Sequence, residues 1–386
     1  MLEWKLIRLG DISKTNKNSY YPKDNWKFVN YLDTGSLTEN KITELQYINT
    51  KTDKMPSRAR RKVIKNSILY STVRPNQLHY GIIKEPVDNL LVSTGFTVID
   101  VDTNKAIPEF IYYLLIQNNT TEQLQAIAEQ SVSTYPSIKP SDIENLEFKL
   151  PNLIIQSKIV SILDTIDSKI CQNEKINNNL EQQAQAIFKS WFIDFEPFSN
   201  RKPSDWSVST LGNVSIMGAG GDKPQNVSLR KTDLYEYPIY SNGLSNEGLY
   251  GFTDNPKVSE ESVTVSARGT IGFVCLRHIP YVPIVRLVTL IPKTEIISAK
   301  YLYLWLKQLH ITGTGTTQQQ LTVPDFQKTE ILVPSKEIVT LFTTTVEPIF
   351  EKIWANQNEN EKLSSLRDTL LPKLMSGELD VSDIEL

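Results

Sequence analysis

The stretch "ICQNEKINNNL", residues 170–180, places amides on the apolar face of a long helical pattern. On either side of it, apolar residues alternate at spacings of four and three, which is typical of a coiled-coil seam. Asn173 and Asn177 occupy two of these seam positions. The seam positions of this segment are Ile159, Leu163, Ile166, Ile170, Asn173, Asn177, Leu180, Ala184, Ile187 and Trp191.

A second segment repeats this pattern, including both amides. Its corresponding positions are Phe342, Val346, Ile349, Ile353, Asn356, Asn360, Leu363, Arg367, Leu370 and Leu374. If the two helices pair antiparallel, Asn173 faces Asn360 and Asn177 faces Asn356. Buried asparagines cost stability but specify register, because a slipped pairing sets amides against aliphatic carbon. The alternative is that these layers are wet and the amides are simply solvated.

The duplication extends to the rest of the chain. "WKLIRLGDIS" (4–13) returns as "WSVSTLGNVS" (206–215), and "SDIENLEFKLP" (141–151) returns as "PDFQKTEILVP" (324–334). We therefore predict two copies of one unit, each a globular part followed by a helix. The predicted segments are globular domains at 1–150 and 201–333 and helical segments at 151–200 and 334–386.

Each globular part has the pattern of a mixed α/β domain. Strands are predicted where β-branched and aromatic residues gather, at 67–73, 90–101, 146–151, 261–267, 284–292 and 329–334. Helices are predicted at 107–117, which opens with Pro108, and at 298–309, capped by Ser298. The expected fold class is α+β: two duplicated mixed α/β domains separated by two long antiparallel coiled-coil helices, with pseudo-twofold symmetry.

Composition and the absence of several motifs limit the function classes that fit the chain. A net charge of -3 gives the chain no overall attraction to nucleic acid or to an anionic membrane, so such binding would rest on local patches. Two lone cysteines favour a reducing compartment, and no apolar run is long enough to cross a bilayer. We expect a cytoplasmic protein without a membrane partner. P-loop, zinc and serine-hydrolase motifs are absent, and "GAGGDKP" (218–224) is predicted to be a tight turn.

Positive charge gathers in the first globular part, before a predicted strand. The candidate DNA-binding residues there are Arg58, Arg60, Arg61, Lys62 and Arg74, which could contact phosphates and, for one or two arginines, guanine. The alternative is a solvated basic loop. In the second copy, the counterpart "SARGTIG" offers Arg268, Gly269 and Thr270.

A short polar stretch lies near the end of each globular part. "SVSTYPS" (131–137) contains Tyr135, and "TGTGTTQQQ" (312–320) contains Gln318 and Gln319. Glutamine can bond adenine bidentately, and small hydroxyl residues suit phosphates. These residues complete the candidate DNA-binding set, although ordinary loops would have the same composition.

Two similar domains at opposite ends of an antiparallel rod would match the twofold symmetry of the DNA backbone. Each domain could bind one half-site, and the rod would set the gap between them. A seam from Ile159 to Trp191 spans about 50 Å at about 1.5 Å per residue, more than the ~34 Å of one duplex turn. The layout thus favours a reader of split DNA targets.

The chain resembles the specificity subunits of type I restriction-modification systems over its whole length. The matching pieces are "PSRARRKVIKNSILYSTVRPN" (56–76), "IVSILDTIDSKI" (159–170), "AIFKSWFIDFEPF" (186–198), "VSARGTIG" (265–272) and "LRDTLLPKLMSGEL" (366–379). The resemblance implies a non-catalytic subunit that reads a bipartite, asymmetric DNA target with its two domains. It also implies that the helices set the number of unread base pairs.

The same resemblance implies partners. These are two methyltransferase subunits, which bind S-adenosylmethionine and methylate adenine N6, and restriction subunits that use ATP and Mg²⁺ to translocate and cleave. No cofactor is expected in this chain. Phe188 and Phe192 lie outside the seam and are predicted to contact helices of the methyltransferase subunits; the alternative is that they pack on this chain's own domains.

Two other functions fit the same sequence features. One is the same architecture in a combined restriction-methylation enzyme that cuts on both sides of its site. The other is a coiled-coil scaffold whose globular domains bind protein. Salt-dependent DNA binding by the reconstituted complex would separate the scaffold from the DNA reader, because phosphate contacts weaken as salt rises.

Overall fold

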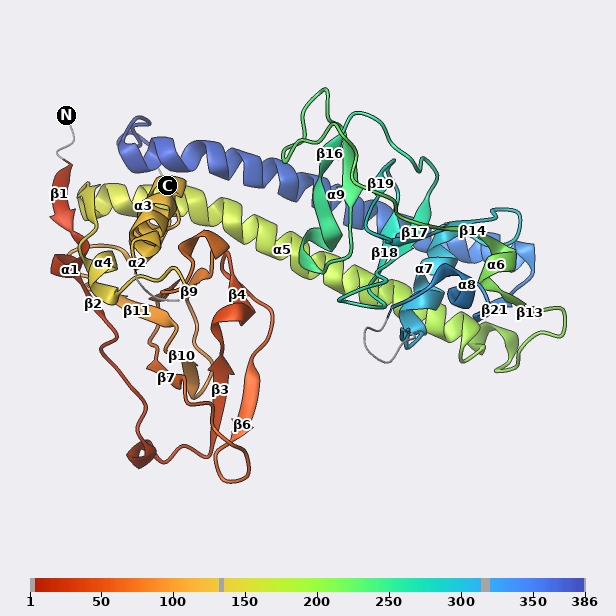
Figure 1. Ribbon diagram of the computed structural model, residues 1–386, viewed down its shortest axis with the longest axis horizontal. Coiled ribbons are helices and arrows are strands. Elements are labelled where there is room, and N and C mark those ends of the chain that lie inside the picture. The colour runs from red at the N-terminus through yellow and green to blue at the C-terminus, as the bar shows by residue number, and fades with distance from the viewer. Residues whose placement is uncertain (1–3, 132–134, 314–319, 385–386) are drawn as a thin grey trace. The chain divides into compact units, whose positions relative to one another are not determined.

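The computed structural model describes residues 4–131, 135–313 and 320–384, which fold as two compact units. Unit 1 comprises Met1–Gln172 and Glu359–Leu386, and unit 2 comprises Asn173–Asn358. Two long helices, α5 (Leu153–Phe192) and α9 (Lys336–Ser376), contribute to both units (Figure 1). The division falls within these helices, so the four predicted segments stay a prediction. None of the helices formed by the described residues is long and apolar enough to span a membrane.

The globular part of unit 1 is built from two four-stranded sheets and two pairs of strands. One sheet has the order β6 (Gln46–Asn49), β3 (Phe28–Leu32), β10 (Leu90–Ser93), β7 (Ala59–Lys62), and the other β2 (Ser13–Thr15), β11 (Phe96–Val101), β8 (Ser67–Ser71), β9 (Tyr80–Ile83). The pairs are β1 (Lys5–Arg8) with β12 (Glu147–Leu150) and β4 (Leu37–Thr38) with β5 (Lys41–Ile42). Its helices are α1 (Leu9–Ile12), α2 (Pro108–Leu115), α3 (Asn118–Glu129) and α4 (Pro140–Glu144).

The globular part of unit 2 repeats this plan with fewer strands. Its sheets have the orders β14 (Ser215–Ala219), β20 (Val288–Pro292), β17 (Ser262–Val265), β18 (Val274–Arg277), and β16 (Leu249–Thr253), β15 (Tyr237–Tyr240), β19 (Val282–Pro283). β13 (Ser207–Thr210) pairs with β21 (Glu330–Val333), as β1 does with β12. The helices are α6 (Leu211–Val214), α7 (Ala299–Gln308) and α8 (Val323–Phe326).

The predicted elements match this structure except where local conformation intervenes. Ser298 caps α7 by accepting a hydrogen bond from the backbone N–H of Tyr301, as predicted. The segment predicted as one strand at 90–101 is two strands, β10 and β11, which lie in different sheets. The strand predicted from residue 284 begins only at Val288, because Val285 and Arg286 both have positive φ and leave the extended conformation.

In unit 1, α5 and α9 meet through apolar and ionic contacts. Leu163 of α5 belongs to the same buried cluster as Leu371 and Leu374 of α9. Beside it, the guanidinium of Arg367 lies 3.0 Å from the carboxylate of Asp167. Tyr113 of α2 donates hydrogen bonds to Asp164 and Asp167, so the same carboxylates also hold the globular part against α5.

In unit 2, amides join the same two helices. Asn356 Nδ2 donates to Asn177 Oδ1 at 2.8 Å, and Asn177 Nδ2 donates to the carbonyl of Ile353 at 3.2 Å. Asn356 is buried and Asn177 half-buried. The pair Asn177 and Asn356 is one of the two that the antiparallel register predicts, and each amide finds a partner that a slipped register would remove.

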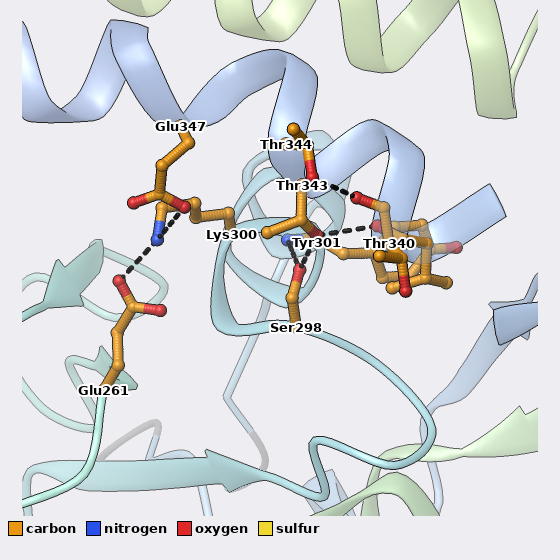
Figure 2. A network of polar contacts seen from close by, with 9 residues as sticks. Glu261, Ser298, Lys300, Tyr301, Thr340, Thr343, Thr344 and Glu347 are labelled. Carbon is orange, nitrogen blue, oxygen red and sulfur yellow. Dashed lines mark hydrogen bonds and ion pairs between the residues drawn. The ribbon is translucent and has the colours of Figure 1, made fainter. Parts of the chain in front are cut away.

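A buried lysine fixes α7 to α9 in unit 2 (Figure 2). The ammonium of Lys300 lies 2.8 Å from Glu261 and 3.1 Å from Glu347 of α9, and its side chain is 5% exposed. Nearby, Thr343 of α9 donates to the hydroxyl of Ser298, the residue that caps α7. A charge at this depth is tolerable only because both carboxylates reach it.

Candidate DNA-binding interface

In unit 1, Arg74 lies on the exposed loop that follows β8. Its φ is +48°, a left-handed conformation that costs energy in a non-glycine residue and persists where the surroundings enforce it. Here the backbone N–H of Arg74 donates to the carbonyl of Pro136 at 3.0 Å. The guanidinium lies over the ring of Tyr135, 5.0 Å from its centroid, and the tyrosine is 57% exposed. The structure thus brings two predicted DNA-binding residues together.

Arg58 belongs to the same region through a short relay of backbone bonds. The N–H of Thr94 donates to the carbonyl of Arg58 at 2.9 Å, and the next residue, Gly95, accepts from the N–H of Thr72 at 2.8 Å. Thr72 in turn accepts from the N–H of Ile138 at 2.8 Å. The loops that carry Arg58, Arg74 and Tyr135 are therefore joined, and both arginines are exposed.

The other cations of the basic stretch are placed differently. Lys62, at the end of β7, forms an ion pair with Asp24 at 2.9 Å and lies over the ring of Trp26. The N–H of Tyr21 and the Lys62 ammonium hold the pKa of Asp24 below its usual value. Arg60 is exposed and Arg61 half-buried on the same strand. Because Lys62 already has a carboxylate partner, it has less charge to offer a phosphate than Arg58 or Arg74.

In unit 2, Arg268 and Gly269 lie on the loop that follows β17. Gly269 has a φ of +69°, and the backbone of Thr270 donates to the carbonyl of Arg268 at 2.8 Å. Arg268 is exposed, and its Nε and Nη2 donate to Gln320 Oε1 at 3.1 and 2.8 Å. Gln320 belongs to the predicted polar stretch; Gln318 and Gln319 lie outside the described residues.

The two copies present these arginines in the same structural context. In unit 2 the N–H of Leu321 donates to the carbonyl of Ala267 at 3.0 Å, as Ile138 does to Thr72 in unit 1. In each case, the loop after the third strand of a four-stranded sheet is paired with the end of the polar stretch. An exposed arginine on that loop then contacts a residue of the stretch.

Sequence reasoning missed Arg286, another exposed arginine of unit 2. Val285 and Arg286 have φ of +53° and +60°, and their N–H groups donate to the carbonyls of Gly221 and Gly220 at 2.9 and 2.8 Å. A Cβ on Gly220 would lie 2.7 Å from the backbone nitrogen of Ile284, so this approach requires glycine. That contact explains Gly220 of the "GAGG" sequence, whereas Gly218 and Ala219 form the end of β14 rather than part of the predicted turn.

Asn242 connects Arg286 with the Arg268 loop. Its Nδ2 donates to the carbonyl of Val285 at 2.6 Å, and its Oδ1 accepts from the N–H of Ala267 at 2.7 Å. One amide side chain thereby holds the residues directly before two exposed arginines. No motif marks Asn242 in the sequence, because its role arises only when segments far apart in the chain meet.

Exposed arginines gather on these loops of both units. The described residues contain no group of histidine, cysteine and acidic side chains that could hold a metal ion. His278 is exposed at the surface yet stacks on Trp354 with ring centroids 4.1 Å apart, and partial desolvation, with the nearby charge of Lys300, lowers the pKa of His278 to about 4. This imidazole is therefore neutral at pH 7 and serves packing.

The predicted role of Phe188 and Phe192 in partner binding is wrong. Their side chains are 0% and 1% exposed. The ring of Phe192 lies 4.9 Å from those of Tyr301 and Phe342 and 5.6 Å from that of Trp206. These aromatic residues fix the globular part of unit 2 to its own helices, so neither phenylalanine is available to another subunit.

Comparison with known proteins identifies relatives of this chain. The model of the type I restriction modification DNA specificity domain matches residues 1–182 and 203–364, once for each copy of the repeat. The HindI specificity subunit of Haemophilus influenzae is 30% identical, covering 98% of this chain and 100% of its own. The MjaIX specificity subunit of Methanocaldococcus jannaschii is 25% identical, covering 98% and 94%.

A solved structure supports the fold independently of sequence. The S subunit of a type I restriction-modification system from M. genitalium matches 99% of this chain and 97% of its own, with a TM-score of 0.57 and 17% identity. At that identity the likeness concerns the fold alone. The family model covers most of the chain and the first relative covers nearly all of it. The chain therefore belongs to the type I restriction-modification DNA specificity family.

Proposed function

We propose that this chain is the DNA-recognition subunit of a type I restriction-modification complex and that it reads a bipartite, asymmetric target. In this role the chain is not an enzyme; it selects the site at which other subunits act. The observation that carries the proposal is the repeated arginine loop: Arg74 beside Tyr135 in unit 1 and Arg268 beside Gln320 in unit 2. Each unit would read one half of the target.

The long helices would form an antiparallel coiled coil that sets the unread gap and gives the two copies a pseudo-twofold relation. In support, none of the predicted seam positions on α5 or α9 is exposed. The bond between Asn177 and Asn356 supplies a registry contact of the kind that specifies one alignment. A gap set by helix length would fix the spacing between the two half-sites.

The chemistry would belong to partner subunits. Two methyltransferase subunits would bind S-adenosylmethionine and methylate adenine N6, and flipping of the target base would take place in them. Restriction subunits would use ATP and Mg²⁺. A chain of net charge -3 suits such an assembly, because DNA would be held jointly by local arginines of this chain and by its partners.

A methylome tests this proposal. The cognate methyltransferase subunit is expressed with and without this chain in cells that lack other adenine methylation, and modified bases are read on both strands. We expect methylation only in the presence of the chain, at a two-part motif with a fixed gap. Methylation that is independent of the chain, or that follows a continuous motif, would contradict the proposal and favour a scaffold.

The register role of the amides gives a second expectation. Replacing Asn173, Asn177, Asn356 and Asn360 with leucine should raise the melting temperature, because apolar groups replace buried amides. The same variant should lose its single alignment, seen as a mixture of masses in solution. Asn178→Leu with Asn358→Leu is the matched control, since both residues are exposed on the same helices. Unchanged stability together with unchanged mass would refute the registry role.

A further inference from the structure

We propose that Arg268 reads a guanine in the half-site bound by unit 2, and that Gln320 is the positioning residue that aims its guanidinium. This inference rests on the proposed function. It adds to that function one base and the atoms that would contact it.

Gln320 engages only one edge of the guanidinium. Its Oε1 accepts from Nε at 3.1 Å and from Nη2 at 2.8 Å, which are the two donors of the side edge. A guanidinium carries five N–H donors in one plane. Among the described residues, no acceptor contacts the end edge, formed by Nη1 and the second hydrogen of Nη2, which is therefore left for another acceptor pair. Guanine presents such a pair in the major groove, O6 and N7, and arginine recognises it bidentately.

The backbone fixes the relative position of the two side chains. Ala267 and Leu321, which directly adjoin Arg268 and Gln320, are joined by a hydrogen bond of 3.0 Å. The N–H of Thr270 donates to the carbonyl of Arg268 and tightens the turn from the other side. Arg268 is exposed yet oriented before any ligand arrives, so binding would cost it less side-chain freedom than it costs an unrestrained arginine.

Fixing the guanidinium plane favours base reading over phosphate contact. Arginine can contact a phosphate bidentately, but phosphate oxygens accept from many directions, so such a contact does not require a fixed guanidinium plane. Bidentate contact with a base requires the donor plane to coincide with the base plane. In the same loop cluster, Arg286 can supply charge for the backbone, since Asn242 holds its turn beside the Arg268 loop.

The test uses the complete complex in the methylome experiment, with the frequency of methylation scored at every single-base neighbour of the motif. Arg268→Lys keeps the charge but removes the planar fork. We expect discrimination at one guanine of one half-site to fall roughly ten-fold to a hundred-fold, with the other half-site and the gap unchanged. Gln320→Ala should weaken discrimination at that same guanine by a smaller factor.

Two further variants separate positioning from general disturbance. Gln320→Glu should retain guanine discrimination, because a carboxylate accepts the same two hydrogen bonds. Arg201 is another exposed arginine of unit 2, and Arg201→Ala should leave base discrimination unchanged at every position of the motif. Thermal melting of each complex identifies any variant that fails to fold. If Arg268→Lys fails to fold, the comparison of Gln320→Ala with Gln320→Glu tests the assignment.

Three outcomes would overturn the assignment. They are full discrimination in Arg268→Lys, a uniform loss of methylation over all neighbours in a folded complex, and a half-site without guanine on either strand. A wild-type chain that yields no two-part motif would instead defeat the proposed function itself, so the two failures are distinguishable.

Discussion

Replacing Phe192 with alanine is expected to lower the free energy of unfolding of unit 2 by about 3–5 kcal/mol. The ring is 1% exposed and lies within 5.6 Å, between ring centroids, of Trp206 and within 4.9 Å of Tyr301 and Phe342. Truncation leaves a cavity between a helix and the globular part, and three large rings lose a neighbour. Urea denaturation of the full chain, followed by tryptophan fluorescence, measures the effect.

Ile193, the residue directly after the end of α5, provides a control. Its side chain is 43% exposed, so Ile193→Ala should change stability by only about 0.5 kcal/mol. Equal effects at the two positions would show that Phe192 is not part of the core. If Phe192→Ala weakens co-purification with a methyltransferase subunit, the expected cause is partial unfolding of unit 2 rather than loss of a direct contact.

The buried Lys300 triad predicts a second large effect with a distinctive asymmetry. Changing Glu261 and Glu347 together to glutamine should destabilise unit 2 by about 3–5 kcal/mol, because an ammonium that is 5% exposed would lose both carboxylates. Lys300→Met should cost far less. It removes the buried charge itself, and the carboxylates, 33% and 36% exposed, can turn to water.

A rescue experiment checks this account. Adding Lys300→Met to the double glutamine variant should restore most of the lost stability, as measured by chemical denaturation. The pair Lys328 and Asp325 is the matched surface control, with side chains 78% and 52% exposed, and Lys328→Met should have an effect of about 0–1 kcal/mol. A triple variant no more stable than the double variant would refute the electrostatic explanation.

Sequence reasoning succeeded where the signal is local or repeated. The seam periodicity and the recurrence of "SDIENLEFKLP" as "PDFQKTEILVP" were enough to predict two copies with a helix after each. Capping by Ser298 is local chemistry and was predictable. The sequence predicts both the arginine segments and the polar stretches as candidate DNA-binding segments. It does not predict that each arginine contacts its polar stretch, because only the fold brings the two within bonding distance.

The failures have physical causes of their own. An apolar residue outside a helical seam has the same pattern whether it faces another subunit or its own domain, so Phe188 and Phe192 were misassigned. Lys62 was predicted to be available for DNA because its ion-pair partner, Asp24, lies far from it in the sequence. Arg286 was predicted to lie in a strand because the residues around it are β-branched. Its positive φ goes with tertiary hydrogen bonds to Gly220 and Gly221, which the neighbouring sequence does not reveal.

The antiparallel pairs β1 with β12 and β13 with β21 carry an evolutionary consequence. In each copy the strand that opens the globular part lies hydrogen-bonded beside the strand that closes it. The chain therefore enters and leaves each globular part at adjacent strands. In both copies the connection to the following long helix begins at the closing strand. A gene segment encoding everything between them can be exchanged for a homologous one that keeps the contacts with the long helices, such as those of Tyr113 and Lys300. If each unit reads one half of the target, as proposed above, recombination within such a gene installs a new half-target in a single event, while the other half and the spacing are inherited unchanged.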